Sequence, residues 1–308
     1  MTKLRANTLK NQNDFAVFIL THGRPTNVKT MDTLQRAGYT GKLYLVVDDE
    51  DKTLDKYIAN FGKDRVVVFD KKQMADQVDE GNNFDERRTI THARNACFEI
   101  AKAKGIKFFM ELDDDYISFE YRYVSKCGQK LKVHKVQNLD QILDLYLEFY
   151  KATGFASIAF AQGGDFIGGV ENKYATKKPL IRKCMNSFIC STERPFQFIG
   201  AMNEDVNTYV TLGSRGKLFG TIPMISLVQT ATQSQKNGIT DMYLRFGTYC
   251  KAFTTVMMHP SSVRISMMNT SNPRIHHNIK WQNTTPMIID EKHKKPNANN
   301  ISQDSTAL

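Results

Sequence analysis

The sequence predicts an α/β protein with a mostly parallel central sheet flanked by helices and a mixed arrangement in its second half. Two observations predict this class. From Phe15 onward, short apolar runs alternate with amphipathic stretches, which is typical of repeated strand–helix units. The first run is apolar at every position, as in a strand that is covered on both faces. With 308 residues, of which 41% are hydrophobic, the chain can bury a sizeable core.

The first half of the chain predicts four strands and three helices. Residues 15–20 (FAVFIL) form the first strand, which ends at a turn containing Gly23 and Pro25. Gly38 and Gly105 end two of the helices. The other predicted elements are helices over 27–37, 54–61 and 89–104, strands over 43–47, 65–69 and 107–112, and a polar surface loop over 71–88 that contains Gly81-Asn82-Asn83.

The second half is less regular. Leucines and tyrosines at helical spacing predict a helix over 139–153, and a second helix is predicted over 205–213. Strands are predicted over 155–161 and 183–190, separated by a glycine-rich stretch, and at least one more within 256–267. From about residue 290 the chain is polar, which predicts a disordered tail over 290–308.

The overall composition points to a polyanionic partner. The net charge is +10 and the isoelectric point is near 9.2, which favours nucleic acid, an anionic membrane surface or phosphorylated substrates. The first residues contain no apolar signal-peptide core, and no apolar run approaches the ~20 residues of a membrane helix. Five scattered cysteines indicate reduced thiols. We therefore expect a soluble protein of the cytoplasm.

Three adjacent carboxylates, Asp113, Asp114 and Asp115, directly follow the strand predicted over 107–112. Adjacent like charges repel one another, and a divalent cation with a preference for oxygen ligands, Mg²⁺ or Mn²⁺, relieves that repulsion. The carboxyl end of a strand in an open α/β sheet is also where ligands bind. The alternative is a solvated acidic turn without a ligand.

Four motifs carry a resemblance to a known family. They are FILTHGRP after the first strand, VVDDED after the second, THARN at the start of a helix, and ELDDDY after the fourth strand. In this order they resemble the GT-A glycosyltransferases over about residues 14–120, with a weaker continuation at Asn203-Glu204-Asp205. More narrowly, the THGRP turn and the ITHARN and ELDDDY motifs resemble phage-encoded DNA-base glycosyltransferases of the TET/JBP-associated group.

The resemblance implies a GT-A-like catalytic domain over 1–289, divided into a nucleotide-sugar-binding half (14–120) and an acceptor-binding half (121–289). It implies a UDP-sugar donor and Mn²⁺ or Mg²⁺. In this family pattern Asp113 contacts the ribose, and Asp113 and Asp115 bind the metal. The family motif is DxD, and because this sequence has a third aspartate, which two of the three form the motif stays open. The other residues that the resemblance places at the nucleotide or sugar are Thr21, His22, Arg24, Asp48, Asp49, Arg94, Asn95 and Asp114.

A second acidic pair, Glu204-Asp205, opens a predicted helix. In inverting GT-A enzymes an acidic residue at such a place is the general base, and the resemblance implies this role for Asp205 ahead of Glu204. Acidic residues are also favoured in a helix's first turn for electrostatic reasons alone. His276 is implied as a late metal ligand; adjacent side chains point apart, so at most one of His276 and His277 would bind.

The acceptor implied by the resemblance is a hydroxymethylated pyrimidine in DNA. Basic residues concentrate in the second half of the chain, where they can neutralise phosphates. Three alternatives stay open: a glycosyltransferase acting on a glycan precursor or a protein, a non-catalytic nucleic-acid-binding protein, and a metal-dependent nuclease or nucleotidyltransferase. The basic residues are Arg122, Lys126, Lys130, Lys132, His134, Lys135, Lys173, Lys177, Lys178, Arg182, Lys183, Arg215 and Lys217.

Overall fold

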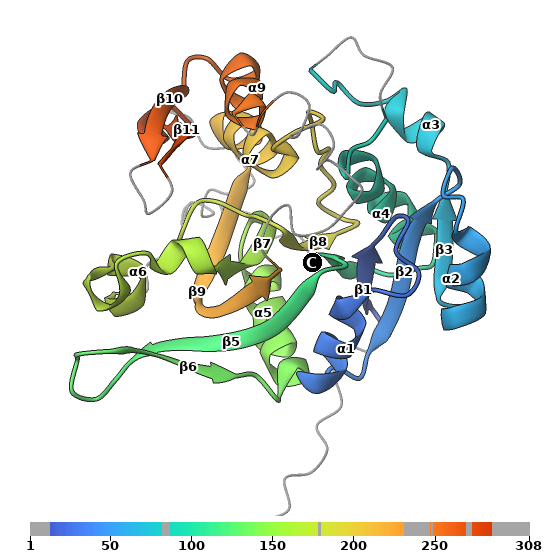
Figure 1. Ribbon diagram of the computed structural model, residues 1–308, viewed down its shortest axis with the longest axis horizontal. Coiled ribbons are helices and arrows are strands. Elements are labelled where there is room, and N and C mark those ends of the chain that lie inside the picture. The colour runs from blue at the N-terminus through green and yellow to red at the C-terminus, as the bar shows by residue number, and fades with distance from the viewer. Residues whose placement is uncertain are drawn as a thin grey trace, which may run out of the picture.

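The computed structural model describes residues 13–81, 87–177, 180–230, 247, 249–268 and 273–284. Within them a nine-stranded sheet has the order β3-β2-β1-β4-β8-β7-β9-β5-β6, and β10 and β11 form a separate pair (Figure 1). The predicted disordered tail and Lys178 lie outside the described residues, as do Asn82 and Asn83 of the predicted loop.

The first half of the sheet is parallel. β1 (Phe15–Leu20) lies between β2 (Lys42–Asp48) and β4 (Phe108–Asp113), and β3 (Val66–Phe69) flanks β2. The register pairs Leu20 with Val46 on one side and with Asp113 on the other, so the carboxyl ends of β1, β2 and β4 meet at one edge. The helices of this half are α1 (Lys29–Arg36), α2 (Leu54–Phe61), α3 (Lys71–Ala75) and α4 (Thr91–Ala103).

The second half is mixed. β8 (Ser187–Ser191) is antiparallel to both β4 and β7 (Phe155–Gln162), and β9 (Leu218–Gln229) is parallel to β7. β5 (Tyr116–Val124) and β6 (Leu131–Lys135) form a hairpin at the end of the sheet opposite β3 (Figure 1). The other elements are α5 (Leu139–Ala152), η1 (Gly163–Phe166), η2 (Gly169–Glu171), α6 (Lys173–Thr176), α7 (Glu204–Ser214), α9 (Cys250–Met258), β10 (Val263–Met268), β11 (Arg274–Ile279) and η3 (Trp281–Thr284).

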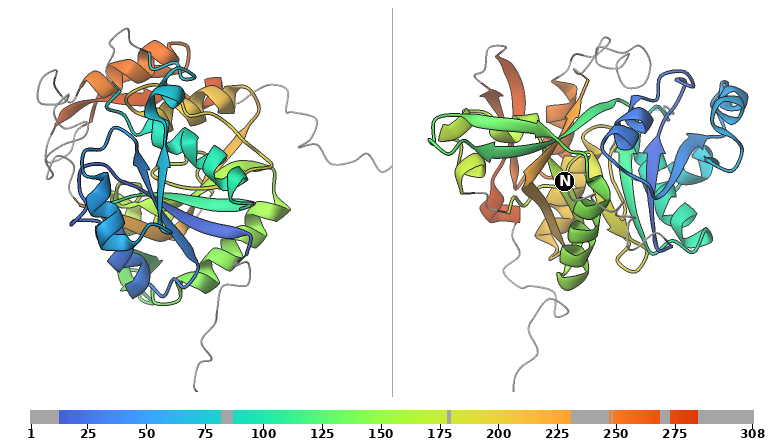
Figure 2. Two further views of the ribbon diagram at one scale, coloured as in Figure 1. Left: turned by 90° about the vertical axis from the view of Figure 1, so that its right-hand side faces the viewer. Right: turned by 90° about the horizontal axis from the view of Figure 1, so that it is seen from below.

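Alternating residues of the buried strands serve two cores, one on each face of the sheet. In β1, Phe15, Val17 and Ile19 pack with residues of α1, α2 and α5, while Ala16, Phe18 and Leu20 pack with residues of α4 and α7. Two further views show helices on both sides of the sheet (Figure 2). Burying a large apolar side chain contributes about 1.5–3 kcal/mol, which makes these two clusters the main support of the fold.

The α/β class with a parallel first half and a mixed second half is confirmed. The predicted loop over 71–88 begins instead with a short helix, α3, because the Asp70 side chain accepts a hydrogen bond from the Gln73 backbone and caps it. The strand predicted over 183–190 starts only at Ser187, because Asn186 adopts a left-handed conformation with φ of 56°. Within 256–267 the chain first completes a helix and then forms β10.

Candidate active site

The residues after β1 and β4 are bound to each other through Asp114. Its Oδ2 accepts a hydrogen bond from the Thr21 hydroxyl at 2.7 Å, and its Oδ1 accepts one from Arg24 Nη1 at 2.8 Å. The Tyr57 hydroxyl lies 2.8 Å from Thr21 Oγ1 and accepts from the Arg24 backbone N–H. Burial raises the pKa of Asp114, against the charge of Arg24. Both Asp114 oxygens are therefore used to fix the turn after β1.

A second group of polar contacts joins the ends of β1 and β2. His22 Nδ1 lies 2.6 Å from Asp48 Oδ2, and Lys71 Nζ lies 3.3 Å from Asp48 Oδ1. The pKa of Asp48 is lowered: burial acts to raise it, but the hydrogen bond from His22 and the charges of His22 and Lys71 outweigh that effect. The same hydrogen bond raises the pKa of His22. The neighbouring Asp49 accepts from the Lys71 backbone N–H at 2.9 Å.

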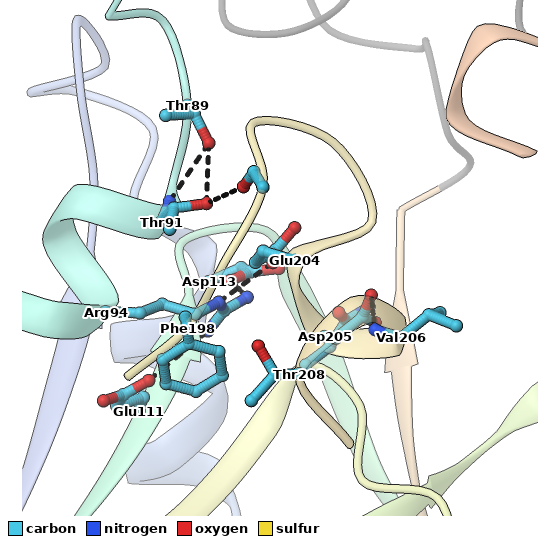
Figure 3. A network of polar contacts seen from close by, with 12 residues as sticks. Thr89, Thr91, Arg94, Glu111, Asp113, Phe198, Glu204, Asp205, Val206 and Thr208 are labelled. Carbon is cyan, nitrogen blue, oxygen red and sulfur yellow. Dashed lines mark hydrogen bonds and ion pairs between the residues drawn. The ribbon is translucent and has the colours of Figure 1, made fainter. Parts of the chain in front are cut away.

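Arg94 joins the parallel half of the sheet to α7. Its side chain extends from α4. The guanidinium donates one hydrogen bond from Nη2 to Asp113 Oδ1 at 2.9 Å and another from Nε to Glu204 Oε1 at 3.0 Å (Figure 3). Nη1 lies 3.7 Å from Oε2 of Glu111, and the Phe188 ring lies under the guanidinium carbon at 4.8 Å. Arg94 is only 1% exposed. A cation from the first half of the chain thus holds one carboxylate of the triple aspartate and one of the second acidic pair.

This buried cluster contains more carboxylates than cations. Burial raises the pKa of Asp113 to about 7, against the charge of Arg94, and raises the pKa of Glu111 well above its usual value. Both carboxylate oxygens of Glu111 are buried and accept no hydrogen bond from another described residue, and the nearby cation is Arg94, whose Nη1 lies 3.7 Å from Oε2. Burial therefore favours the protonated forms of these carboxyl groups, and the positive charge of Arg94 opposes that effect.

The second acidic pair opens α7 beside this cluster. Burial and the negative charge of Glu204 raise the pKa of Asp205 to about 7, and one Asp205 oxygen accepts from the Val206 backbone N–H at 2.7 Å (Figure 3). A general base works best when its pKa is close to the working pH, so Asp205 has the acidity that a base needs. Glu204, in contrast, accepts a hydrogen bond from Arg94 Nε.

Asp115 differs from the two aspartates before it. Within the described part of the chain, its buried Oδ1 has no hydrogen-bond partner, and burial raises the pKa of Asp115. The Thr230 hydroxyl and backbone N–H bind the Asp115 carbonyl, at 2.8 and 3.3 Å, and fix its backbone. Asp115 Oδ1 and the neighbouring Asp113 would suit a divalent cation, because Mg²⁺ and Mn²⁺ prefer carboxylate oxygens as ligands. Among the described residues, no three histidine, cysteine or acidic side chains could hold a metal by themselves.

Two sequence-predicted site residues have other surroundings. Asn95 donates to the Phe198 carbonyl at 3.1 Å and accepts from the Phe198 backbone N–H at 2.8 Å, so its amide fixes the segment before α7. His276 lies in β11, and its electrostatic neighbours are Lys251, Arg274 and Lys183. Contact of Asn95 with a nucleotide, and of His276 with a metal, stay predictions.

Sequence reasoning missed three contributors: Tyr57, Lys71 and Glu111. Tyr57 and Lys71 contact the predicted site residues Thr21 and Asp48 from α2 and α3, and nothing in the spacing of the sequence marks those contacts. Glu111 gave a signal, because a lone charged residue inside an apolar strand must meet a partner in the fold.

A protein-family model matches most of the chain. Residues 15–238 match the family described as TET-Associated Glycosyltransferase. The chain belongs to this family. The chain is therefore a glycosyltransferase, and the predicted resemblance to the TET-associated group is confirmed. No curated protein sequence matches the chain, and none of its described helices is long and apolar enough to cross a membrane.

The TET-associated glycosyltransferase is also similar to several solved structures. Glucosyl-3-phosphoglycerate synthase from Mycobacterium tuberculosis, in complex with Mg²⁺ and UDP, is 12% identical with a TM-score of 0.44, over 86% of this chain and 87% of that chain. A mannosyltransferase from Pyrobaculum calidifontis, in complex with GDP-Man and Mn²⁺, is 12% identical with a TM-score of 0.44, over 80% and 73%.

Proposed function

We propose that this TET-associated glycosyltransferase transfers a sugar from a UDP-sugar to the hydroxyl of a hydroxymethylated pyrimidine in DNA, with inversion at the anomeric carbon. The observation that carries the proposal is the Arg94 contact pair, which places the triple aspartate beside Glu204-Asp205. In this proposal the triple aspartate belongs to the site of the nucleotide diphosphate and the metal, and the acidic pair supplies the general base.

In the proposed reaction the Asp205 carboxylate accepts the proton of the acceptor hydroxyl. The hydroxyl oxygen attacks the anomeric carbon as the bond from that carbon to the diphosphate oxygen breaks, which releases UDP. Glu204 stays bound to Arg94 and contributes negative charge that keeps the pKa of Asp205 raised. Thr21, His22 and Arg24 lie on the nucleotide side, where Asp114 and Asp48 hold them.

Asp115 and Asp113 are the residues that would hold Mn²⁺ or Mg²⁺, and the bound cation would neutralise the diphosphate leaving group. The unpartnered Oδ1 of Asp115 supports this assignment. We propose that residues 14–120 form the nucleotide-sugar half of a catalytic domain over 1–289 and that residues 121–289 form the acceptor half, in a cytoplasmic protein.

DNA as the acceptor is supported by the net charge of +10, by the basic residues of the second half and by the family description. A hydroxymethyl group inside a duplex is out of reach of a buried carboxylate, so the target base must be flipped or single-stranded.

UDP release with Mn²⁺ tests the proposal, with hydroxymethylcytosine, hydroxymethyluracil and unmodified DNA compared as acceptors. We expect release that depends on the hydroxymethylated base and is lost in Asp115→Ala. Release that is the same with all three DNAs would contradict DNA-base transfer and direct the search to glycan or protein acceptors.

A further inference from the structure

The hairpin of β5 and β6 begins at the triple aspartate and ends at the far edge of the sheet. β5 starts directly after Asp115, and β6 is the last strand in the sheet order, at the end opposite β3 (Figure 1). At about 3.3 Å per residue, the eight steps along the chain from Asp115 to Tyr123 span about 25 Å. The outer part of the hairpin therefore lies well away from the candidate metal site and is connected to it by a single strand.

The two faces of the hairpin have different surroundings. On one face the guanidinium of Arg122 lies 5.4 Å from the centre of the Phe166 ring, and Val124 packs against the small cluster that contains Phe166. Side chains alternate along a strand, so Tyr123 points to the other face. There its ring stacks on the ring of His134, with 5.6 Å between the centroids and 6° between the planes. One face is thus packed against the protein, and the other carries a stacked ring pair.

The face with the ring pair also carries two lysines. Lys132 is paired with Tyr123 in the register of the hairpin, and Lys130 and His134 lie two positions to either side of Lys132, on the same face. All three of these side chains are exposed. Within the described part of the chain, neither lysine side chain has an ion-pair or hydrogen-bond partner. Their positive charge is therefore available to a partner molecule.

Other charged residues of this half of the chain are already paired. Glu120, the one acidic residue within 116–135, is bound by Arg122 at 2.8 Å, and Lys183 forms an ion pair with Asp165. Lysines on an edge strand also oppose pairing with another sheet, but a stacked ring pair has no part in that effect. Positive charge beside exposed rings is the combination that binds single-stranded nucleic acid.

We propose that the hairpin face formed by Tyr123, Lys130, Lys132 and His134 binds the single strand of DNA that flanks the target nucleotide. The two lysines contact phosphates of this strand, and an unpaired base stacks on the exposed ring of His134. That this strand belongs to the acceptor rests on the proposed function. A span of about 25 Å corresponds to about seven stacked nucleotides, which places the contact that far along the strand from the target.

Binding of a fluorescently labelled DNA measures this contact without any sugar transfer. The probes are a single strand of about twenty nucleotides and the corresponding duplex, titrated by fluorescence anisotropy at several salt concentrations. The variants are Lys130→Gln/Lys132→Gln and His134→Ala.

Each variant has a matched control. Lys56→Gln/Lys63→Gln removes two exposed lysines in and just after α2, which packs beside β3 at the opposite end of the sheet. Val133→Ala truncates the exposed neighbour of His134, which points to the other face of the hairpin.

For Lys130→Gln/Lys132→Gln we expect the slope of log Kd against log salt concentration to fall by about 1.4, because each phosphate contact with a single strand contributes about 0.7. For His134→Ala we expect the Kd of the single strand to rise about fivefold or more and that of the duplex to stay within about twofold, because only an unpaired base offers a face for stacking. Both controls should bind as wild type does. Thermal unfolding of all four should match wild type, since every replaced side chain is exposed.

Sugar transfer tests the place of the contact along the strand. Lys130→Gln/Lys132→Gln should raise the KM of a long acceptor and leave unchanged that of an acceptor with only about three nucleotides on each side of the target.

An unchanged salt slope in Lys130→Gln/Lys132→Gln, or an equal change in Lys56→Gln/Lys63→Gln, would overturn the proposal, because the hairpin lysines would then act only through solubility or overall charge. An equal loss of duplex and single-strand binding in His134→Ala would overturn it as well. If the double variant does not fold, Lys132→Gln alone should lower the slope by about 0.7. Failure of the proposed function is distinct, since wild type would then bind DNA through the hairpin and transfer no sugar.

Discussion

Arg94 and Glu204 are 110 positions apart in the chain, yet a 3.0 Å hydrogen bond joins them in the buried centre of the site. The same guanidinium binds Asp113, which belongs to the triple aspartate. The triple aspartate and the acidic pair at the start of α7 are therefore held together by one cation. We therefore expect Arg94 to position these carboxylates, since its guanidinium is buried and bound to both of them.

Replacing Arg94 with methionine should destabilise the protein by about 3–5 kcal/mol at pH 8, because buried carboxylates lose their cation. The loss should be smaller at pH 6, because Asp113 and Asp205, with pKa values of about 7, then carry protons. Denaturant unfolding at the two pH values measures this difference. An equal loss at both would mean that charge is not the cause. Arg94→Lys, which keeps the charge, is the control.

Asp114 and Asp115 should respond differently to replacement by asparagine. Asp114→Asn weakens the bonds to Thr21 and Arg24 and should cost about 1.5–3 kcal/mol of stability. Asp115→Asn removes the charge of a carboxylate whose Oδ1 is not hydrogen-bonded by any described residue, so this change should cost less stability. It should, however, abolish Mn²⁺-dependent binding of UDP. Thermal unfolding and calorimetric titration of UDP separate the two effects. Mn²⁺-dependent binding that persists in Asp115→Asn would remove Asp115 from the metal site.

The acidic pair provides a matched comparison on one helix. Asp205→Asn should lower kcat about 10²- to 10⁴-fold with an unchanged KM for the UDP-sugar, because a general base acts in the chemical step. Glu204→Gln retains an acceptor for Arg94 and should lower kcat less. Steady-state kinetics of both variants test the assignment. If Glu204→Gln is the more damaged of the two, the base is Glu204.

The pH dependence of kcat/KM follows from the raised pKa of Asp205. A base must be deprotonated to accept a proton, so activity should be low below pH 7 and rise as the pH increases through about 7. The small residual activity of Asp205→Asn should lack this rise. A wild-type profile that is flat between pH 5 and pH 9, or that falls through pH 7, would exclude Asp205 as the base.

The parallel half of the fold was predictable because its strands are continuous apolar runs bounded by glycine or acidic residues. β9 was not, because Pro223 interrupts its apolar residues and a proline is unusual inside a sheet. The strand accommodates it where its register with β7 shifts, between the Phe160 and Ala161 pairings. β5 and β6 were also missed, since β5 places charged residues between its aromatic ones and β6 is mostly exposed.

The carboxylates of the candidate site could be predicted from the sequence, but the contacts between them and other segments could not. Asp113, Asp115 and Asp205 stand out by their place after a strand or at a helix start. Three tertiary contacts between distant segments connect them. Arg94 binds Asp113, Asn95 binds the Phe198 backbone, and Asn203 binds the Lys251 carbonyl of α9. A single sequence has no local pattern that encodes such pairings.

The most direct test of the central claim is the mass of a hydroxymethylated DNA strand after incubation with the protein, a UDP-sugar and Mn²⁺. The account predicts a gain equal to one transferred sugar residue for each target base, absent with Asp205→Asn and absent on unmodified DNA. A strand whose mass is unchanged with every UDP-sugar, while the protein still binds UDP and Mn²⁺, would contradict transfer to DNA.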